Sequence, residues 1–212
     1  MAKPHFSIRL QLVLALCISA IFLPGCAQNV LNYAWTDSEY HGPVQGPILV
    51  IGVFKDPTVR KIYEDSFVTG LQSAGVTAIP SHQFDLQTTE PTTEDIRQIV
   101  KQAGASAVLI THLLSEDTKS FEFLSTRYAV GGAMISSAFY GYHSTIYGAT
   151  FGGSETIDKT TDRMAAVLFE VQSEKLIWSA HSKSVNLNNM LRTDDEKLEA
   201  IFITDMKTHN IL

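Results

Sequence analysis

The sequence predicts a single α/β domain of three-layer type, with helices packed on a mixed sheet. Continuous apolar runs at 48–54 and 105–113 have the composition of buried strands, and amphipathic helical patterns lie between them. Two further apolar segments, 163–172 and 176–185, flank a short polar turn, as in an antiparallel hairpin. The expected element order is β-α-β-α-β-(insert)-β-β-α.

The first strand, 48–54, leads into a helix whose start and stop are both marked. Asp56 fits an N-cap, and Pro57 fits the first helical position, where its missing N–H costs nothing. Gly75 supplies the stop, because glycine commonly follows the last turn of a helix. A short second strand is expected at 76–80.

A second helix is predicted from the capping box that Thr92 and Asp95 form, and it ends before Gly104. The strand at 105–113 follows. Strand–helix–strand units pair in parallel with right-handed crossovers, so the first three strands are expected to be parallel. After the hairpin, Thr193 and Glu196 form a further capping box, which opens a last helix.

Several of these segments resemble one family of periplasmic lipoprotein domains. The segments GLQSAG, AGASAVLITHL and VLFEVQSEKLIWSA, the last with Trp178 near its end, are similar to the group related to the amino-terminal domain of TolB. The curli-secretion lipoprotein and the lipoprotein activators of penicillin-binding proteins share that architecture. The resemblance implies the same α/β fold and a role in assembly and binding, with no catalytic residue to transfer.

The amino terminus has the pattern of a secreted and lipidated chain. Lys3 and Arg9 precede the apolar run 10–23, which is too short to span a bilayer and fits a signal peptide over residues 1–25. The run ends in Leu23-Pro24-Gly25-Cys26, which resembles the lipobox of bacterial lipoproteins, although Pro24 departs from it. That resemblance implies acylation of Cys26; the alternative is an incidental thiol.

Two or more acyl chains anchor a protein stably, so Cys26 predicts attachment to a membrane without spanning it. In the lipoprotein family, a residue other than Asp after the cysteine favours the outer membrane, and here it is Ala27. The expected location is therefore the periplasm-facing outer membrane, with the inner membrane as the alternative. Residues 26–47 show no periodicity and predict a lipidated tether, and 48–212 form the domain.

Charge excludes some classes of partner. The chain has 16 basic and 22 acidic residues, and cleavage before Cys26 removes two of the basic ones, which leaves 14 against 22. Nucleic-acid binders need a basic surface, and none is indicated. The acyl chains alone are then expected to supply the membrane affinity.

An uncharged insert at about 128–154 interrupts the fold, with six glycines and five aromatic residues in 131–153. Three interpretations are open: a transmembrane helix, a pair of membrane-spanning strands as in the curli channel, or a long loop that packs on the domain or binds a partner. Glycine permits close backbone approach and tyrosine offers a large contact area, which favours the loop. The expected contact residues are Tyr140, Tyr142, Tyr147 and Phe151.

The sequence contains no motif for catalysis, a cofactor or a metal. His82 and His112 follow consecutive strand ends, where α/β sites gather, and Asp85 or Glu116 could lie near them. A surface or satisfied core histidine is the favoured explanation for each of them. We therefore expect no enzyme, no cofactor and no metal. The predicted function is a membrane-anchored binding or assembly module that contacts another envelope protein or itself; the alternative is a homo-oligomeric secretion channel built with strands from the insert.

Overall fold

The computed structural model describes residues 31–84, 91–114, 138–152, 163–182 and 198–212. Its centre is one six-stranded sheet with the strand order β1-β6-β5-β4-β2-β3. The strands are β1 (Leu31–Thr36), β2 (Ile48–Val53), β3 (Ala78–Pro80), β4 (Ala107–Leu114), β5 (Arg163–Glu170) and β6 (Leu176–Ser182). The helices are α2 (Pro57–Ser73), η2 (Ser81–Gln83), α3 (Thr93–Ala103), α5 (Ala138–Gly152) and α7 (Leu198–Thr208).

The topology confirms the predicted α/β class and its mixed sheet. Strand β2 pairs in parallel with both β3 and β4, as the strand–helix–strand order requires. Strands β4, β5 and β6 then pair antiparallel, with β5 and β6 forming the predicted hairpin. Glu174 in the hairpin turn has a φ of 54°, a left-handed conformation that the tight connection imposes.

The predicted helix starts are confirmed by capping hydrogen bonds from side chains. The Asp56 carboxylate accepts hydrogen bonds from the backbone N–H groups of Thr58 and Val59 at 2.7 and 3.3 Å. Thr92 and Asp95 form the complete capping box of α3. Gly104 ends that helix at a φ of 58°, where a residue with a Cβ would be strained. The box predicted at Thr193 and Glu196 lies outside the described residues.

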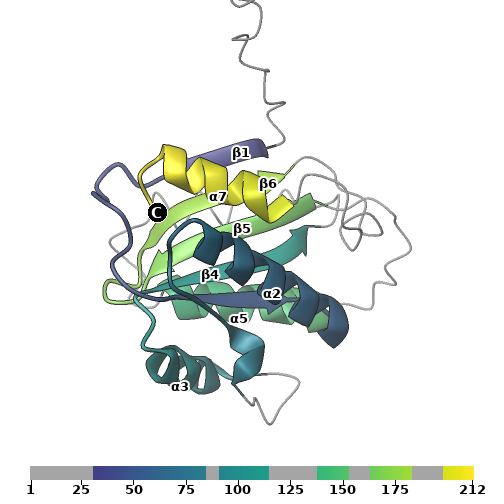
Figure 1. The fold of residues 1–212 in the computed structure, drawn as a ribbon. Helices are drawn as coiled ribbons and strands as arrows, with labels where there is room; N and C mark the ends of the chain where they lie inside the picture. Colours follow the sequence, from purple (N-terminus) through teal and green to yellow (C-terminus); the bar gives the residue numbers. More distant parts are fainter. Residues whose placement is uncertain (1–30, 85–90, 115–137, 153–162, 183–197) are drawn as a thin grey trace, which may run out of the picture.

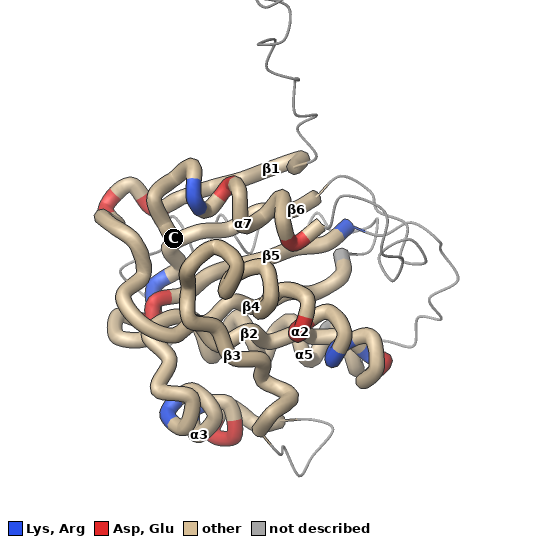
Figure 2. The backbone as a smooth tube through the Cα atoms, in the orientation of Figure 1, with Lys and Arg blue, Asp and Glu red and all other residues tan. Residues whose placement is uncertain are grey.

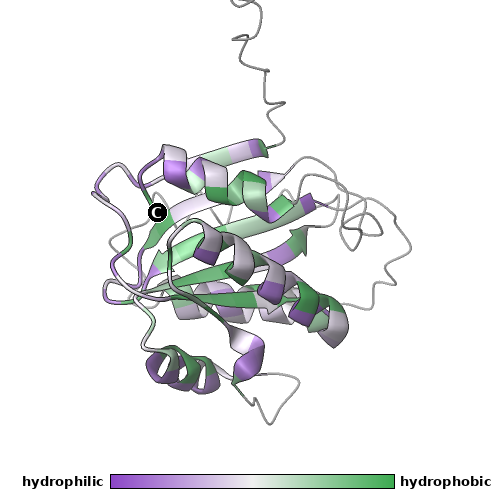
Figure 3. Ribbon diagram, in the orientation of Figure 1, coloured by the Kyte–Doolittle hydropathy of each residue, from purple (hydrophilic) through white to green (hydrophobic). Residues whose placement is uncertain are grey.

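Helices cover both faces of the sheet, which makes three layers (Figure 1). Helices α2 and α7 lie on one face, over a core that includes Phe67, Trp178 and Phe202. Helices α3 and α5 lie on the other, over a core that includes Ile110, Phe139 and Phe169. Strand β2 is hydrophobic and buried along its whole length (Figure 3), because both of its faces are covered.

One predicted boundary is wrong. Residues 26–47 were expected to form a tether, but Leu31–Thr36 is strand β1, which pairs antiparallel with β6 from Leu31↔Ser182 to Thr36↔Trp178. Tyr33 also stacks on His181 of β6, with ring centroids 5.5 Å apart. The sheet therefore begins at residue 31, well before the apolar run at 48–54.

The insert also differs from its prediction. Ala138–Gly152 is the helix α5, neither a loop nor a membrane-facing strand. Among the residues that the structure describes, no helix has the length and apolar character needed to cross a membrane. The rest of the insert, 128–137 and 153–154, lies outside the described residues.

Candidate functional site

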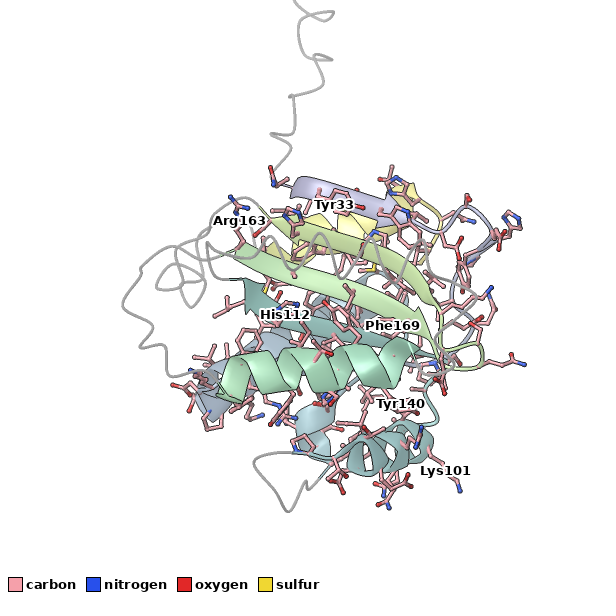
Figure 4. The ribbon with its side chains drawn as sticks, turned by 180° about the vertical axis from the view of Figure 1, so that it is seen from behind. Tyr33, Lys101, His112, Tyr140, Arg163 and Phe169 are labelled. Carbon is pink, nitrogen blue, oxygen red and sulfur yellow. The ribbon has the colours of Figure 1, made fainter. Side chains whose placement is uncertain are left out.

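The first half of α5 holds the helix against the sheet (Figure 4). Phe139 and Tyr142 both pack on Phe169 of β5, with ring centroids 5.7 and 5.5 Å apart. Tyr142 is 1% exposed, so it belongs to the core of its own domain and does not form the partner contact predicted for it. Its ring anchors the helix.

Tyr140 joins α5 to α3. The Arg97 guanidinium lies over the Tyr140 ring, 4.5 Å from its centroid, and Arg97 also pairs with Glu94 at 3.6 Å. Burial raises the pKa of Tyr140, and the nearby Glu174 raises it further, so its hydroxyl stays neutral. Tyr140 is 9% exposed, which again corrects the prediction of an open contact residue.

Tyr147 and Phe151 have a different environment. Their rings stack with centroids 4.4 Å apart at 19°, and His143 stacks on the other side of Tyr147 at 5.4 Å. Both residues are only partly buried. The three rings form a row along α5, which we call the aromatic row. Its outer members, Tyr147 and Phe151, are the two predicted contact residues that the structure leaves accessible.

Two histidines at α5 are buried: His112, which lies on β4 beneath the helix, and His143, which lies on the helix itself. The His112 Nε2 atom lies 3.0 Å from the Tyr142 hydroxyl oxygen, and its Nδ1 atom lies 3.1 Å from the Leu113 carbonyl oxygen. Burial lowers the pKa of His112 to about 4. Burial also lowers the pKa of His143 to about 4, and the charge of Arg60 adds to this effect. Both rings are therefore neutral at pH 7.

A buried carboxylate, Glu64, organises the neighbouring edge of the sheet. Its side chain is fully buried, and Oε1 accepts from the Gly52 N–H at 2.9 Å, the Arg60 Nε–H at 3.0 Å and the Ser81 hydroxyl at 2.7 Å. The His82 N–H donates to Oε2 at 2.8 Å. Three of these hydrogen bonds tie α2 to the end of β2 and to η2, and the fourth, from Arg60, lies within α2.

The histidines that the sequence placed at neighbouring strand ends have separate partners. His82 Nε2 lies 2.6 Å from Asp65 Oδ1, whose carboxylate also pairs with Lys61 at 2.9 Å. His112 is instead bonded to Tyr142 on the other face of the sheet (Figure 4). Asp85 and Glu116, the predicted neighbours, lie outside the described residues.

Two remaining features of the described residues are the distribution of charge and the placement of residues that could bind a metal. Among the described residues, acidic and basic positions are interspersed along the backbone (Figure 2). In residues 31–84, 91–114, 138–152, 163–182 and 198–212, no group of three His, Cys, Asp or Glu side chains is placed to hold a metal ion. Cys26, the predicted lipid-attachment residue, precedes the described residues.

No family model matches the chain, and no curated protein matches it. Among solved structures, it is similar to lipoprotein GNA1162 from Neisseria meningitidis, with a TM-score of 0.38 and 16% identity over 78% of this chain and 97% of that one. It is also similar to the PelC dodecamer from Paraburkholderia phytofirmans, with a TM-score of 0.34 and 11% identity over 73% of this chain and 83% of that one. The chain thus has structural similarity, at low identity, to a lipoprotein and to a subunit of a dodecamer.

Proposed function

We propose that the chain is a lipid-anchored protein of the bacterial outer membrane, facing the periplasm, and that it acts by binding another envelope protein rather than by catalysis. The observation that carries this proposal is the apolar run ending in Leu23-Pro24-Gly25-Cys26, followed at once by a folded domain. A signal peptide would deliver the domain across a membrane, and acyl chains on Cys26 would keep it there.

The position of β1 limits how far the domain can move from its anchor. Leu31, the first residue of β1, follows Cys26 by five positions. Five extended residues reach at most about 17 Å. An anchored domain would therefore lie against the bilayer, and only partners close to the membrane surface could reach it.

The aromatic row offers the contact surface that the described residues support best. Tyr147 and Phe151 are stacked on each other and partly exposed, on a helix whose inner face is fixed by Tyr142. Aromatic side chains are enriched at protein interfaces, because they bury a large area and lose little conformational freedom. This rigid pair is suited to a pocket on a partner.

Replacement of Cys26 by alanine tests the anchor. We expect the wild-type protein to fractionate with the outer membrane and to carry a diacylglycerol-modified Cys26 as its first residue, which mass spectrometry would detect. The Cys26→Ala protein should lose the lipid and leave the outer-membrane fraction. A processed Cys26→Ala protein that stays in that fraction would contradict lipid anchoring.

Paired substitution of Tyr147 and Phe151 by serine tests the contact surface. We expect chemical crosslinking in intact cells to join the wild-type protein to a defined envelope protein, and the double variant to lose at least about nine-tenths of that adduct, as for residues that dominate an interface. Ile62→Ser is the matched control, because Ile62 is a large hydrophobic residue on α2 that is 46% exposed. Equal loss in both variants would contradict a specific role for the aromatic row.

The native mass of the mature protein in mild detergent separates the two kinds of partner. A complex of fixed stoichiometry with a second protein supports the proposal as stated. A mass that is a multiple of this chain alone would contradict a separate envelope partner and would mean that the chain associates with itself.

A further inference from the structure

The two edges of the sheet differ in how they are protected, and the edge at β3 is blocked. The Thr77 carbonyl accepts a hydrogen bond from the Ile48 N–H at 2.9 Å, so the next residue, Ala78, directs its backbone groups away from β2. The Ala78 carbonyl accepts a hydrogen bond from the Gln72 side chain at 3.3 Å, and Pro80 has no N–H to donate. A further strand therefore finds no regular row of donors and acceptors beside β3.

The opposite edge, at β1, presents such a row. The Asp37 N–H donates to the Ile177 carbonyl of β6 at 3.0 Å, directly after the last residue of β1. Because backbone groups alternate along an antiparallel strand, the N–H and C=O groups of Thr36 and Ala34 point away from β6. Among the described residues, β1 has a hydrogen-bonded neighbour on one side only.

The composition of β1 also leaves this edge open to pairing. Natural edge strands are commonly protected by a charged residue, a proline or a bulge. The strand LNYAWT contains no charge and no proline, and its register shift, between Leu31 and Tyr33, comes before Ala34. Ala34 is exposed, so the strand is accessible where its backbone groups point outward.

We propose that the outer edge of β1 binds an extended segment of the envelope partner, which joins the sheet as an additional strand. Main-chain hydrogen bonds to Ala34 and Thr36 would hold the segment, as in β-strand addition. Strand β1 is already fixed by its pairing with β6, so it loses little conformational freedom on binding. An uncharged segment rich in β-branched or aromatic residues would fit, since β1 offers no charge to pair with. This inference rests on the proposed binding function, since it takes the segment from the envelope partner.

The short link to the proposed anchor favours another protein over a second copy of this chain. Two antiparallel copies of β1 would be related by a two-fold axis normal to the sheet, so both anchors reach one membrane only if the sheet lies parallel to it. Helices lie on both faces of the sheet (Figure 1), and a layer about 10–12 Å thick would then separate the sheet from the bilayer. A link of at most about 17 Å would cross that layer with little slack. A partner's segment beside the membrane requires no such orientation.

Replacement of Ala34 by proline tests the backbone contact. Proline removes the outward N–H of residue 34 and leaves the hydrogen bonds to β6 in place, as edge strands tolerate. We expect about tenfold weaker partner binding, measured as chemically crosslinked adduct in intact cells over a range of expression levels. Ala34→Val is the matched control, because it changes the side chain at the same exposed position and keeps the N–H. We expect Ala34→Val to bind like the wild type.

A photo-crosslinking amino acid in place of Ala34 identifies the bound segment. We expect p-benzoylphenylalanine at this position to form adducts that mass spectrometry maps to one short stretch of the partner. The same amino acid in place of Ile62, which is 46% exposed on α2, should form no adduct with that stretch. The Ala34→Pro protein should melt within about 4 °C of the wild type. If its Tm falls further than this, the adduct from residue 34 alone decides.

The outcomes separate this inference from the function on which it rests. Wild-type binding by Ala34→Pro, equal losses in Ala34→Pro and Ala34→Val, or no adduct from residue 34 would overturn β1 as a binding edge. Adducts from residue 34 between two copies of this chain would overturn the partner segment as its occupant. If any of these results appears while chemical crosslinking of the wild type still yields the envelope partner, only this inference fails. If the wild type yields no adduct with any envelope protein, the proposed binding function fails as well.

Discussion

Replacement of Glu64 by alanine is expected to lower the free energy of unfolding by about 3–5 kcal/mol. The substitution would leave the buried Gly52 N–H and the His82 N–H without their acceptor. It would also leave the Arg60 guanidinium without its carboxylate, although the Arg60 Nη2 would keep its bond to Ser81 at 2.8 Å. The cost comes from the stranded donors more than from the lost ion pair.

Chemical denaturation of the wild type and the variant at pH 7 would measure this difference. Asp65→Asn is the control, since Asp65 is the adjacent residue and its side chain is 47% exposed, so we expect it to cost about 1 kcal/mol or less. Similar decreases in the free energy of unfolding for Glu64→Ala and Asp65→Asn would show that Glu64 does not organise this edge of the sheet. Glu64→Gln should fall between them, because an amide keeps one acceptor but turns an N–H towards a donor.

Mild acid is expected to destabilise the domain through His112 and His143. Both have a folded-state pKa of about 4, against 6.5 for the free side chain, because burial disfavours the charged ring. Between pH 6.5 and 4 the unfolded chain therefore binds more protons than the folded one, and stability falls as the pH falls. Above pH 6.5 the effect is absent, and below pH 4 it stops growing. Each histidine accounts for about 3 kcal/mol at pH 4.

Free energies of unfolding measured from pH 7.5 to pH 4 would test whether His112 and His143 cause the loss of stability in acid. The His112→Gln and His143→Gln variants should each remove about half of the acid dependence, and the double variant most of it. His209→Gln is the control, because His209 is exposed at the end of α7. An unchanged pH profile in the double variant would assign the acid sensitivity to other groups.

The elements with local signals were predictable from the sequence. Asp56 and the Thr92–Asp95 box mark helix starts by chemistry that acts within three residues, so no knowledge of the fold is needed. The continuous apolar runs of β2 and β4 identify strands covered on both faces. The hairpin of β5 and β6 was predictable because a short polar turn separates two apolar segments.

The elements that depend on distant contacts were missed. Helix α5 has glycines at 141, 148 and 152, which favour a loop by propensity, and it is held instead by Phe139 and Tyr142 packing on Phe169. Strand β1 lacks an apolar run because it lies at the edge of the sheet.

The same reason explains the missed site residues. Glu64 has the appearance of a solvent-facing helical residue, and only Gly52 and Ser81, 12 and 17 positions away, make it a buried one. Ile62 is apolar but lies outside the inner face of its helix and is 46% exposed. The true inner face contains Tyr63, Phe67 and Leu71, together with Glu64.

The pairing of β1 with β6 also sets the order in which the chain can fold. Leu31 pairs with Ser182, and 182 minus 31 gives a sequence separation of 151 residues. Contacts this far apart form slowly, because a long loop must close before they are made. A chain that emerges amino terminus first therefore exposes β1 early and must wait for β6, while β2, α2, β3, α3 and β4 can assemble from shorter-range contacts. Strand β1 would therefore be the last to join the sheet. If Cys26 carries the proposed lipid, folding would finish at the end of the domain that is nearest the membrane.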